Sequence, residues 1–256
     1  MCFDLDSHPP IAPIAGGALD SRQLALTAAD GTRFDAFLAR AAQPTGAGMI
    51  VLPDVRGLHR YYEELALRFA EAGIDSIAID YFARTAPTSA RDESFEFMPH
   101  VGLTTYPTLT ADIAAAAKEL RAGGRVRSLF TVGFCFGGRL AFLTSSQDLD
   151  LAGAIGFYGP PTGAARNLMP APVEVAGQMH APILGLFGGT DQSIPQEARD
   201  EFDRALTAAG VEHELYAYPD APHSFFDRKA AEFADDSTDA WRRVLAFVHD
   251  HNPHER

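Results

Sequence analysis

The sequence predicts an α/β fold in which a mostly parallel sheet carries helices on both of its faces. Two observations predict this fold class. Short, unbroken apolar runs, typical of strands buried on both faces, alternate along the chain with segments of helical periodicity. Strands and helices that alternate in this way form parallel sheets with helices packed on either side. The 256 residues contain no repeat, low-complexity tract or linker, so we expect a single domain over residues 1–256.

The first half of the chain begins with an expected irregular arm over residues 1–20, which is rich in proline, glycine and alanine. Alternating apolar and polar residues on both sides of an Ala-Asp-Gly tripeptide then predict a hairpin, which we place as antiparallel strands at one edge of the sheet. An apolar run between Gly48 and Pro53 predicts a buried strand, and the spacing of Leu65 and Phe69 predicts a helix that ends before Gly73. The expected elements are residues 23–28 with 33–40, 49–52, 61–72 and 74–79.

The second half of the chain continues the alternation of strands and helices. Residues 81–108 and 160–179 are interrupted by prolines and are expected to be irregular loops. The expected strands are residues 129–132, 154–158, 183–187 and 213–218. The expected helices are residues 109–122, a segment that continues to about residue 145, residues 195–209 and the amphipathic residues 239–251.

Charge and cysteine content exclude several classes of partner. The chain has 34 acidic and 21 basic residues, for a net charge of −13, and this negative field repels nucleic acids and anionic membranes. The sequence shows no basic leader that would predict a signal peptide, and no apolar run long enough to predict a membrane span. Two cysteines are too few for a disulfide framework. We therefore expect a cytoplasmic protein, a monomer or weak homo-oligomer, whose partner is a small molecule rather than nucleic acid or membrane.

A sharp strand-to-helix turn is predicted at residues 133–138, which read Gly-Phe-Cys-Phe-Gly-Gly. Small residues two positions before and after Cys135 let the chain pass through a strained turn, so that the thiol stands above the sheet at a helix N-terminus. Free N–H groups and the helix dipole there favour a thiolate and a developing oxyanion. An inert core cysteine is the alternative interpretation. The buried strand before the motif and the helix after it favour a nucleophile.

A cysteine nucleophile needs a base, and the base needs a group that orients it. Asp191 follows the expected strand 183–187 through Gly-Gly-Thr, and His223 follows the expected strand 213–218 through Pro-Asp-Ala-Pro. Both lie at carboxyl ends of strands, where open α/β sheets hold their ligands. Taken singly, Asp191 also fits a helix cap and His223 a surface loop. Their order after Cys135 favours a catalytic triad of nucleophile, acid and histidine.

These motifs, Gly-Phe-Cys-Phe-Gly-Gly, Gly-Gly-Thr-Asp and His-Ser-Phe, resemble those of the dienelactone hydrolase family from about residue 18 to 247. The resemblance implies an α/β-hydrolase fold with a Cys-His-Asp triad that opens lactones or esters, with carboxymethylenebutenolide as the type substrate. Cysteine in place of serine at the nucleophile separates this family from the serine esterases. It also implies no cofactor, and the histidines show no metal-binding spacing.

The resemblance implies further roles near the thiol. In the family, a glutamate after the first buried strand holds the resting thiol, and the matching residue here is Asp54, which is one methylene shorter. We therefore expect Asp54 to reach Cys135 less well and to leave more of it as thiolate. The backbone N–H groups of Val55 and Phe136 are implied as the oxyanion hole.

Arginines hold the substrate carboxylate in the family. The family pattern of an arginine with a tyrosine four residues later is matched best by Arg91 and Phe95, which lacks the hydroxyl, and Arg84 is a nearby alternative. The second family arginine, four residues after the histidine, is replaced by Asp227, with Arg228 beside it. An aspartate there would repel a carboxylate, so the sequence predicts only a weak preference for carboxylate-bearing substrates.

The primary functional prediction is a hydrolase that cleaves small esters or lactones through a thioester on Cys135. A thioesterase is the first alternative. A low-turnover binding or sensing protein on the same fold is the second, and the replacement of the family glutamate and arginine motivates it.

Overall fold

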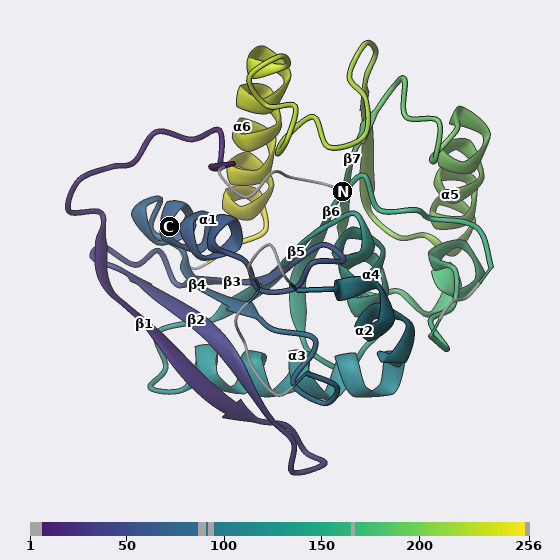
Figure 1. Ribbon diagram of the computed structural model, residues 1–256. Helices are drawn as coiled ribbons and strands as arrows, with labels where there is room; N and C mark the ends of the chain where they lie inside the picture. The colour runs from purple at the N-terminus through teal and green to yellow at the C-terminus, as the bar shows by residue number, and fades with distance from the viewer. Residues whose placement is uncertain (1–6, 87–90, 92–94, 165–166, 254–256) are drawn as a thin grey trace.

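The computed structural model describes residues 7–86, 91, 95–164 and 167–253. Eight strands form one sheet in the order β1-β2-β4-β3-β5-β6-β7-β8 (Figure 1). The strands are β1 (Ala18–Thr27), β2 (Arg33–Ala41), β3 (Ala47–Leu52), β4 (Asp75–Ile79), β5 (Ser128–Phe134), β6 (Leu151–Phe157), β7 (Ile183–Gly188) and β8 (His213–Tyr218).

The pairing directions confirm the predicted fold class. Strands β4, β3, β5, β6, β7 and β8 pair with one another in parallel. The hairpin β1–β2 is antiparallel, and β2 joins the parallel part by antiparallel pairing with β4. The hairpin therefore forms one edge of the sheet, as predicted, while β8 forms the other edge.

Helices cover both faces of the sheet. The helices are α1 (Arg60–Glu71), α2 (Phe97–Leu103), α3 (Tyr106–Arg121), α4 (Phe136–Thr144), α5 (Gln196–Ala209) and α6 (Ala234–Asp250), with a 3₁₀ helix η1 (Pro172–Gln178). In Figure 1, α1 and α6 lie above the sheet, and α3 lies below it. Within the described ranges, no helix combines the length and apolar character needed to cross a bilayer.

The central strands are buried because both of their faces are covered. In β5, Phe130 and Phe134 contact residues of α6 and α1 through their rings, whereas Thr131 on the opposite face hydrogen-bonds Thr144 of α4 at 2.8 Å. The alternation of side chains along a strand produces this division. It explains why these strands read as continuous apolar runs rather than as alternating ones.

The region 81–108 is more helical than the sequence predicts. Helix α2 occupies Phe97–Leu103 and α3 begins at Tyr106, three residues before the expected start. Pro107 stands in the first turn of α3, where a missing N–H breaks no helical hydrogen bond, and Thr105 forms a capping box with Thr108. The prolines predict an irregular loop, but Pro107 lies in the first turn of a helix.

The N-terminal arm is shorter than predicted, because β1 already begins at Ala18, and the described part of the arm contacts α1. His8 contacts Glu64 at 2.5 Å, and the backbone N–H of Ile14 donates to Glu71 at 2.9 Å. The first six residues of the expected arm, including Cys2, lie outside the described residues.

Candidate active site

The turn between β5 and α4 holds Cys135 in a backbone conformation that side chains rarely adopt. Its φ is 55° and its ψ is −110°, and its N–H donates to the carbonyl of Phe157 at 3.0 Å. A Cβ atom on Gly133 would lie 1.9 Å from the carbonyl oxygen of Gly137, and one on Gly137 would lie 2.2 Å from that of Leu52. The two glycines therefore permit the close approach that such a strained turn requires.

We expect Gly137→Ala to destabilise the protein by about 3 kcal/mol or more, because the new methyl group would overlap two backbone carbonyls that cannot rotate away. Gly177→Ala is the matched control, since a Cβ there meets no atom within 4 Å. Thermal unfolding of both variants measures the difference. Equal melting temperatures for the two would contradict the close approach at the turn.

Asp191 and His223 meet above the carboxyl ends of β7 and β8. The imidazole Nδ1 of His223 lies 2.6 Å from Oδ2 of Asp191. The other oxygen, Oδ1, accepts hydrogen bonds from the backbone N–H and the hydroxyl of Ser193, at 2.9 and 2.6 Å. Burial raises the pKa of the Asp191 carboxyl, but the bonds from His223 and Ser193 outweigh it and leave the pKa below its ordinary value. Asp191 is therefore an anion suited to orient an imidazole and to stabilise its charged form.

Asp227 is buried rather than open to a substrate. It is 3 % exposed, and its Oδ2 accepts a hydrogen bond from the hydroxyl of Tyr158 at 2.5 Å. Burial raises the pKa of its carboxyl well above the ordinary value, against the opposing hydrogen bonds from Tyr158 and the Arg228 backbone, and the charge of Asp54 raises it further. The carboxyl is thus held in the interior by Tyr158 and the Arg228 backbone rather than facing a substrate.

The loop after β3 packs against the turn that holds Cys135. A Cβ on Gly137 would lie 2.3 Å from the carbonyl of Pro53, which brings residues 53–55 beside the start of α4. Asp54 is buried, and its Oδ1 accepts the N–H of Arg56 at 2.9 Å. Val55 is half-buried in this loop. The backbone of Val55 thus belongs to a segment next to Phe136, the other residue that was expected to donate to an oxyanion.

A cavity of about 320 Å³ lies over the turn. Besides Cys135 and Phe136, it is lined by Arg139, Met169 and the segment that contains Pro160 and residues 162–164. Small-ligand sites are typically mostly apolar with a few polar groups, and of a few hundred Å³. Sequence reasoning missed Arg139, although a residue four positions after Cys135 on a helix lies on the same helical face.

The arginines that were predicted to bind substrate form ion pairs with aspartates. Arg84 pairs with Asp30 at 2.8 Å and also with Asp112. Arg91 is buried and pairs with Asp80 through two nitrogens, at 3.0 and 2.6 Å. Neither arginine lines the cavity over Cys135.

Phe95 packs on the guanidinium of Arg91 rather than lining the cavity. The centre of the guanidinium lies 4.4 Å from the centre of the Phe95 ring, and the ring of His100 stacks on Phe95 at 5.0 Å. Phe95 is not among the residues that line the cavity over Cys135. The structure therefore places Arg91 and Phe95 together in a cluster that includes Asp80.

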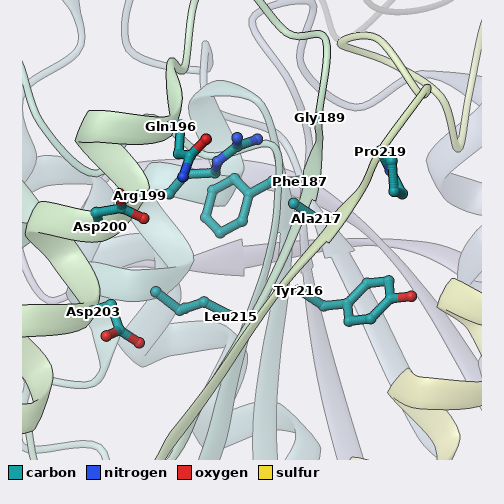
Figure 2. A pocket seen from close by; sticks show the side chains of 10 residues that line it. All are labelled: Phe187, Gly189, Gln196, Arg199, Asp200, Asp203, Leu215, Tyr216, Ala217 and Pro219. Atoms are coloured by element: carbon teal, nitrogen blue, oxygen red, sulfur yellow. The ribbon is translucent and has the colours of Figure 1, made fainter.

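A second hollow lies between α5 and β8 (Figure 2). It has a volume of about 420 Å³ and includes Arg199, Asp200 and Tyr216 in its lining, but none of the residues predicted for the site. Arg199 donates to the carbonyl of Gly188 at 2.8 Å. In the part of the chain that the structure describes, no three His, Cys, Asp or Glu side chains are grouped so that they could hold a metal ion.

Comparisons with known proteins identify similar sequences and folds. A family model described as "Dienelactone hydrolase family" matches residues 34–252. The Escherichia coli (strain K12) protein named "Putative carboxymethylenebutenolidase" is 32% identical over 251 residues, which cover 93% of each chain. A Klebsiella pneumoniae crystal structure named "Putative Dienelactone Hydrolase" is 28% identical with a TM-score of 0.77, covering 90% of this chain and 99% of that one. The dienelactone hydrolase-like promiscuous phosphotriesterase P91, from metagenomic libraries, shares the fold at 21% identity, with a TM-score of 0.72 over 91% of this chain and 99% of that one.

Proposed function

The chain belongs to the dienelactone hydrolase family and is an ester or lactone hydrolase; from this premise we propose that it works through a thioester on Cys135. The observation that carries the proposal is the joint geometry of the strained turn and the acid–histidine pair. Cys135 has a φ of 55° at a helix N-terminus. His223 lies 2.6 Å from Asp191, and all three residues follow the carboxyl ends of parallel strands. A cysteine at a strand-to-helix turn, together with a histidine oriented by an aspartate, makes up a nucleophilic triad.

In the first half of the proposed reaction, the sulfur of Cys135 attacks the substrate carbonyl carbon. The thiol proton passes to Nε2 of His223, while Nδ1 donates to Asp191. The new C–S bond yields a tetrahedral oxyanion, which collapses when the C–O bond to the leaving group breaks. The imidazolium returns its proton to the departing alkoxide, and the acyl group remains as a thioester.

In the second half, His223 takes a proton from water, and the resulting hydroxide attacks the thioester carbon. The C–S bond then breaks, the thiol is restored and the carboxylic acid leaves. The N–H groups of Phe136 and Val55 are the proposed oxyanion donors in both halves. Each such donor can lower the activation barrier by about 3 kcal/mol, because its N–H is already aimed at the developing charge.

Arg139 supports a preference for substrates whose acyl group ends in an anion. It lines the cavity over Cys135, and its guanidinium donates to the carbonyls of Thr162 and Gly163 at 2.9 and 3.2 Å. Burial lowers the pKa of this guanidinium, against a smaller opposite effect of Glu174. Among the described residues, no carboxylate forms an ion pair with Arg139. A substrate carboxylate could form an ion pair with this half-buried cation.

We expect the 4-nitrophenyl monoester of succinic acid to be hydrolysed with a higher kcat/KM than its neutral methyl ester. Arg139→Gln should lower kcat/KM for the anionic substrate by about 10-fold or more, since a hydrogen bond to a charged group is worth about 1.5–3 kcal/mol. The neutral substrate should change little. Arg199→Gln is the matched control, because Arg199 also donates to a backbone carbonyl but lines the hollow in Figure 2.

The ratio of kcat/KM for the anionic ester to kcat/KM for the neutral ester shows whether Arg139 binds the substrate or only holds the loop that contains Thr162. If Arg139 only holds the segment with Thr162, both substrates lose activity equally in Arg139→Gln and the charge preference is refuted. A wild type that turns over neither ester would instead refute the proposed reaction. Comparison with an acyl thioester of the same acid tests the thioesterase alternative, and multiple turnover of any of them excludes a pure binding protein.

A further inference from the structure

Tyr158 and Asp227 form a buried hydrogen-bonded pair beside the proposed catalytic histidine. Tyr158 follows the last residue of β6 and is fully buried, and Asp227 lies four residues after His223 on the turn that leads to α6. The hydroxyl of Tyr158 donates to Oδ2 of Asp227 at 2.5 Å. The ring of Tyr158 contacts the imidazole of His223, with 4.8 Å between ring centres. The pair therefore links the end of a central strand to the loop that carries the imidazole.

Strained backbone on both sides of the imidazole indicates what the link does. Tyr158 has a φ of 38°, and Ser224, next to His223, has a φ of 64°. A positive φ costs free energy for any residue other than glycine, and it persists only where the surrounding structure holds the residue in place. The N–H of Tyr158 donates to the carbonyl of Leu186 at 2.7 Å, and the bond from its hydroxyl to Asp227 spans the two strained segments. The hydrogen bond between Tyr158 and Asp227 therefore connects the two strained segments that lie on either side of His223.

We propose that Tyr158 and Asp227 are positioning residues, which hold the imidazole of His223 in place for proton transfer with Cys135. This inference rests on the proposed function, in which His223 is the base. Asp191 holds the imidazole through its Nδ1, and the Tyr158 ring limits its tilt from one side. Two such constraints from different strands fix both the position and the plane of the ring, and the precision of such placement controls the rate of proton transfer.

Several charged and titratable groups face the carboxyl of Asp227. The carboxyl is faced by Asp54 from the loop after β3, Tyr61 from α1, Tyr158 just after β6 and His223 from its own loop. Burial raises the pKa of Asp227 well above its ordinary value, and Asp54 adds to the rise. An amide at this position offers an oxygen that can accept the same bond from Tyr158.

Four variants test this role with 4-nitrophenyl acetate as substrate. Tyr158→Phe keeps the ring and removes the hydroxyl, and Asp227→Leu removes the acceptor. Each should lower kcat by about 10- to 100-fold with little change in KM, since a misplacement of about 1 Å can cost about 100-fold. Asp227→Asn should retain kcat within about 3-fold and the wild-type pH profile near neutrality. The double variant Tyr158→Phe/Asp227→Leu should be no slower than the slower single variant, because the two residues share one interaction.

Alkylation of Cys135 by iodoacetamide provides a readout that does not depend on turnover. We expect slower alkylation at neutral pH in Tyr158→Phe and Asp227→Leu, because a misplaced imidazole accepts the thiol proton less well. Tyr218→Phe is the matched control: its hydroxyl donates to Asp239 at 3.0 Å in a bond of the same type, directed toward α6. It should lose stability similarly while keeping kcat and the alkylation rate.

The possible outcomes separate this inference from the proposed function. If His223→Gln leaves turnover intact, the proposed base is wrong. If His223→Gln abolishes turnover while Tyr158→Phe keeps wild-type kcat and alkylation, the positioning role is refuted. A purely structural role would lower the melting temperature without slowing alkylation of the folded protein, and this also refutes it. Tyr158→Phe decides the matter by itself if Asp227→Leu does not fold.

Discussion

Cys135→Ala is expected to abolish hydrolysis of activated esters, with kcat reduced by roughly 10⁴-fold or more, as removal of a triad nucleophile does in other hydrolases. The reason is that the methyl group has no electron pair with which to attack the carbonyl carbon. The fold should remain, because the side chain is only half-buried and the loss of one sulfur leaves a small change in packing. Steady-state rates and a thermal unfolding curve for the variant measure both expectations.

The covalent intermediate is the sharper readout of the same residue. Intact-mass spectrometry of wild type with a slow ester should show one acyl adduct, and peptide mapping should assign it to Cys135. Cys135→Ala should show no adduct, and Cys135→Ser should keep a trace of activity, because a hydroxyl is a weaker nucleophile than a thiolate. Full turnover by Cys135→Ala would show that another group attacks the substrate.

The acid and the base are expected to produce the second large effect. His223→Gln removes the proton acceptor, and Asp191→Asn removes the anion that lies 2.6 Å from Nδ1. Each should reduce kcat by roughly 10³- to 10⁴-fold, because the imidazole is either absent or wrongly oriented and its charged form is no longer stabilised. Tm values of the variants control for misfolding, since Asp191 is buried and accepts two bonds from Ser193.

The double variant His223→Gln/Asp191→Asn tests whether Asp191 affects the rate only through His223 or independently of it. With His223 removed, Asp191 has no imidazole to orient, so the double variant should be about as slow as His223→Gln alone. A loss equal to the product of the two single losses would mean that Asp191 contributes to the rate by a route other than His223.

Local sequence signals predict the parallel core of this fold well, because a strand buried on both faces must be an unbroken apolar run. They fail where a side chain's role depends on context. Pro107 looks like a breaker in isolation and instead starts α3. Helix α6 begins at Ala234, five residues before the expected start, because two acidic residues in its first turn suit a helix N-terminus although they add nothing to the apolar period.

The sequence by itself determined the features that local chemistry dictates: the alternation of strands and helices, the glycines on either side of Cys135, and the positions of Asp191 and His223 after their strands. Only the tertiary structure decided which charges are available to a substrate. Arg84 and Arg91 are neutralised by aspartates, whereas Asp227 meets Tyr158 across 69 residues of chain. Arg139 instead lines the cavity over Cys135. Chain spacing cannot reveal such pairings, because the partner of a charged side chain is set by the folding of distant segments, and burial then determines whether that side chain remains charged.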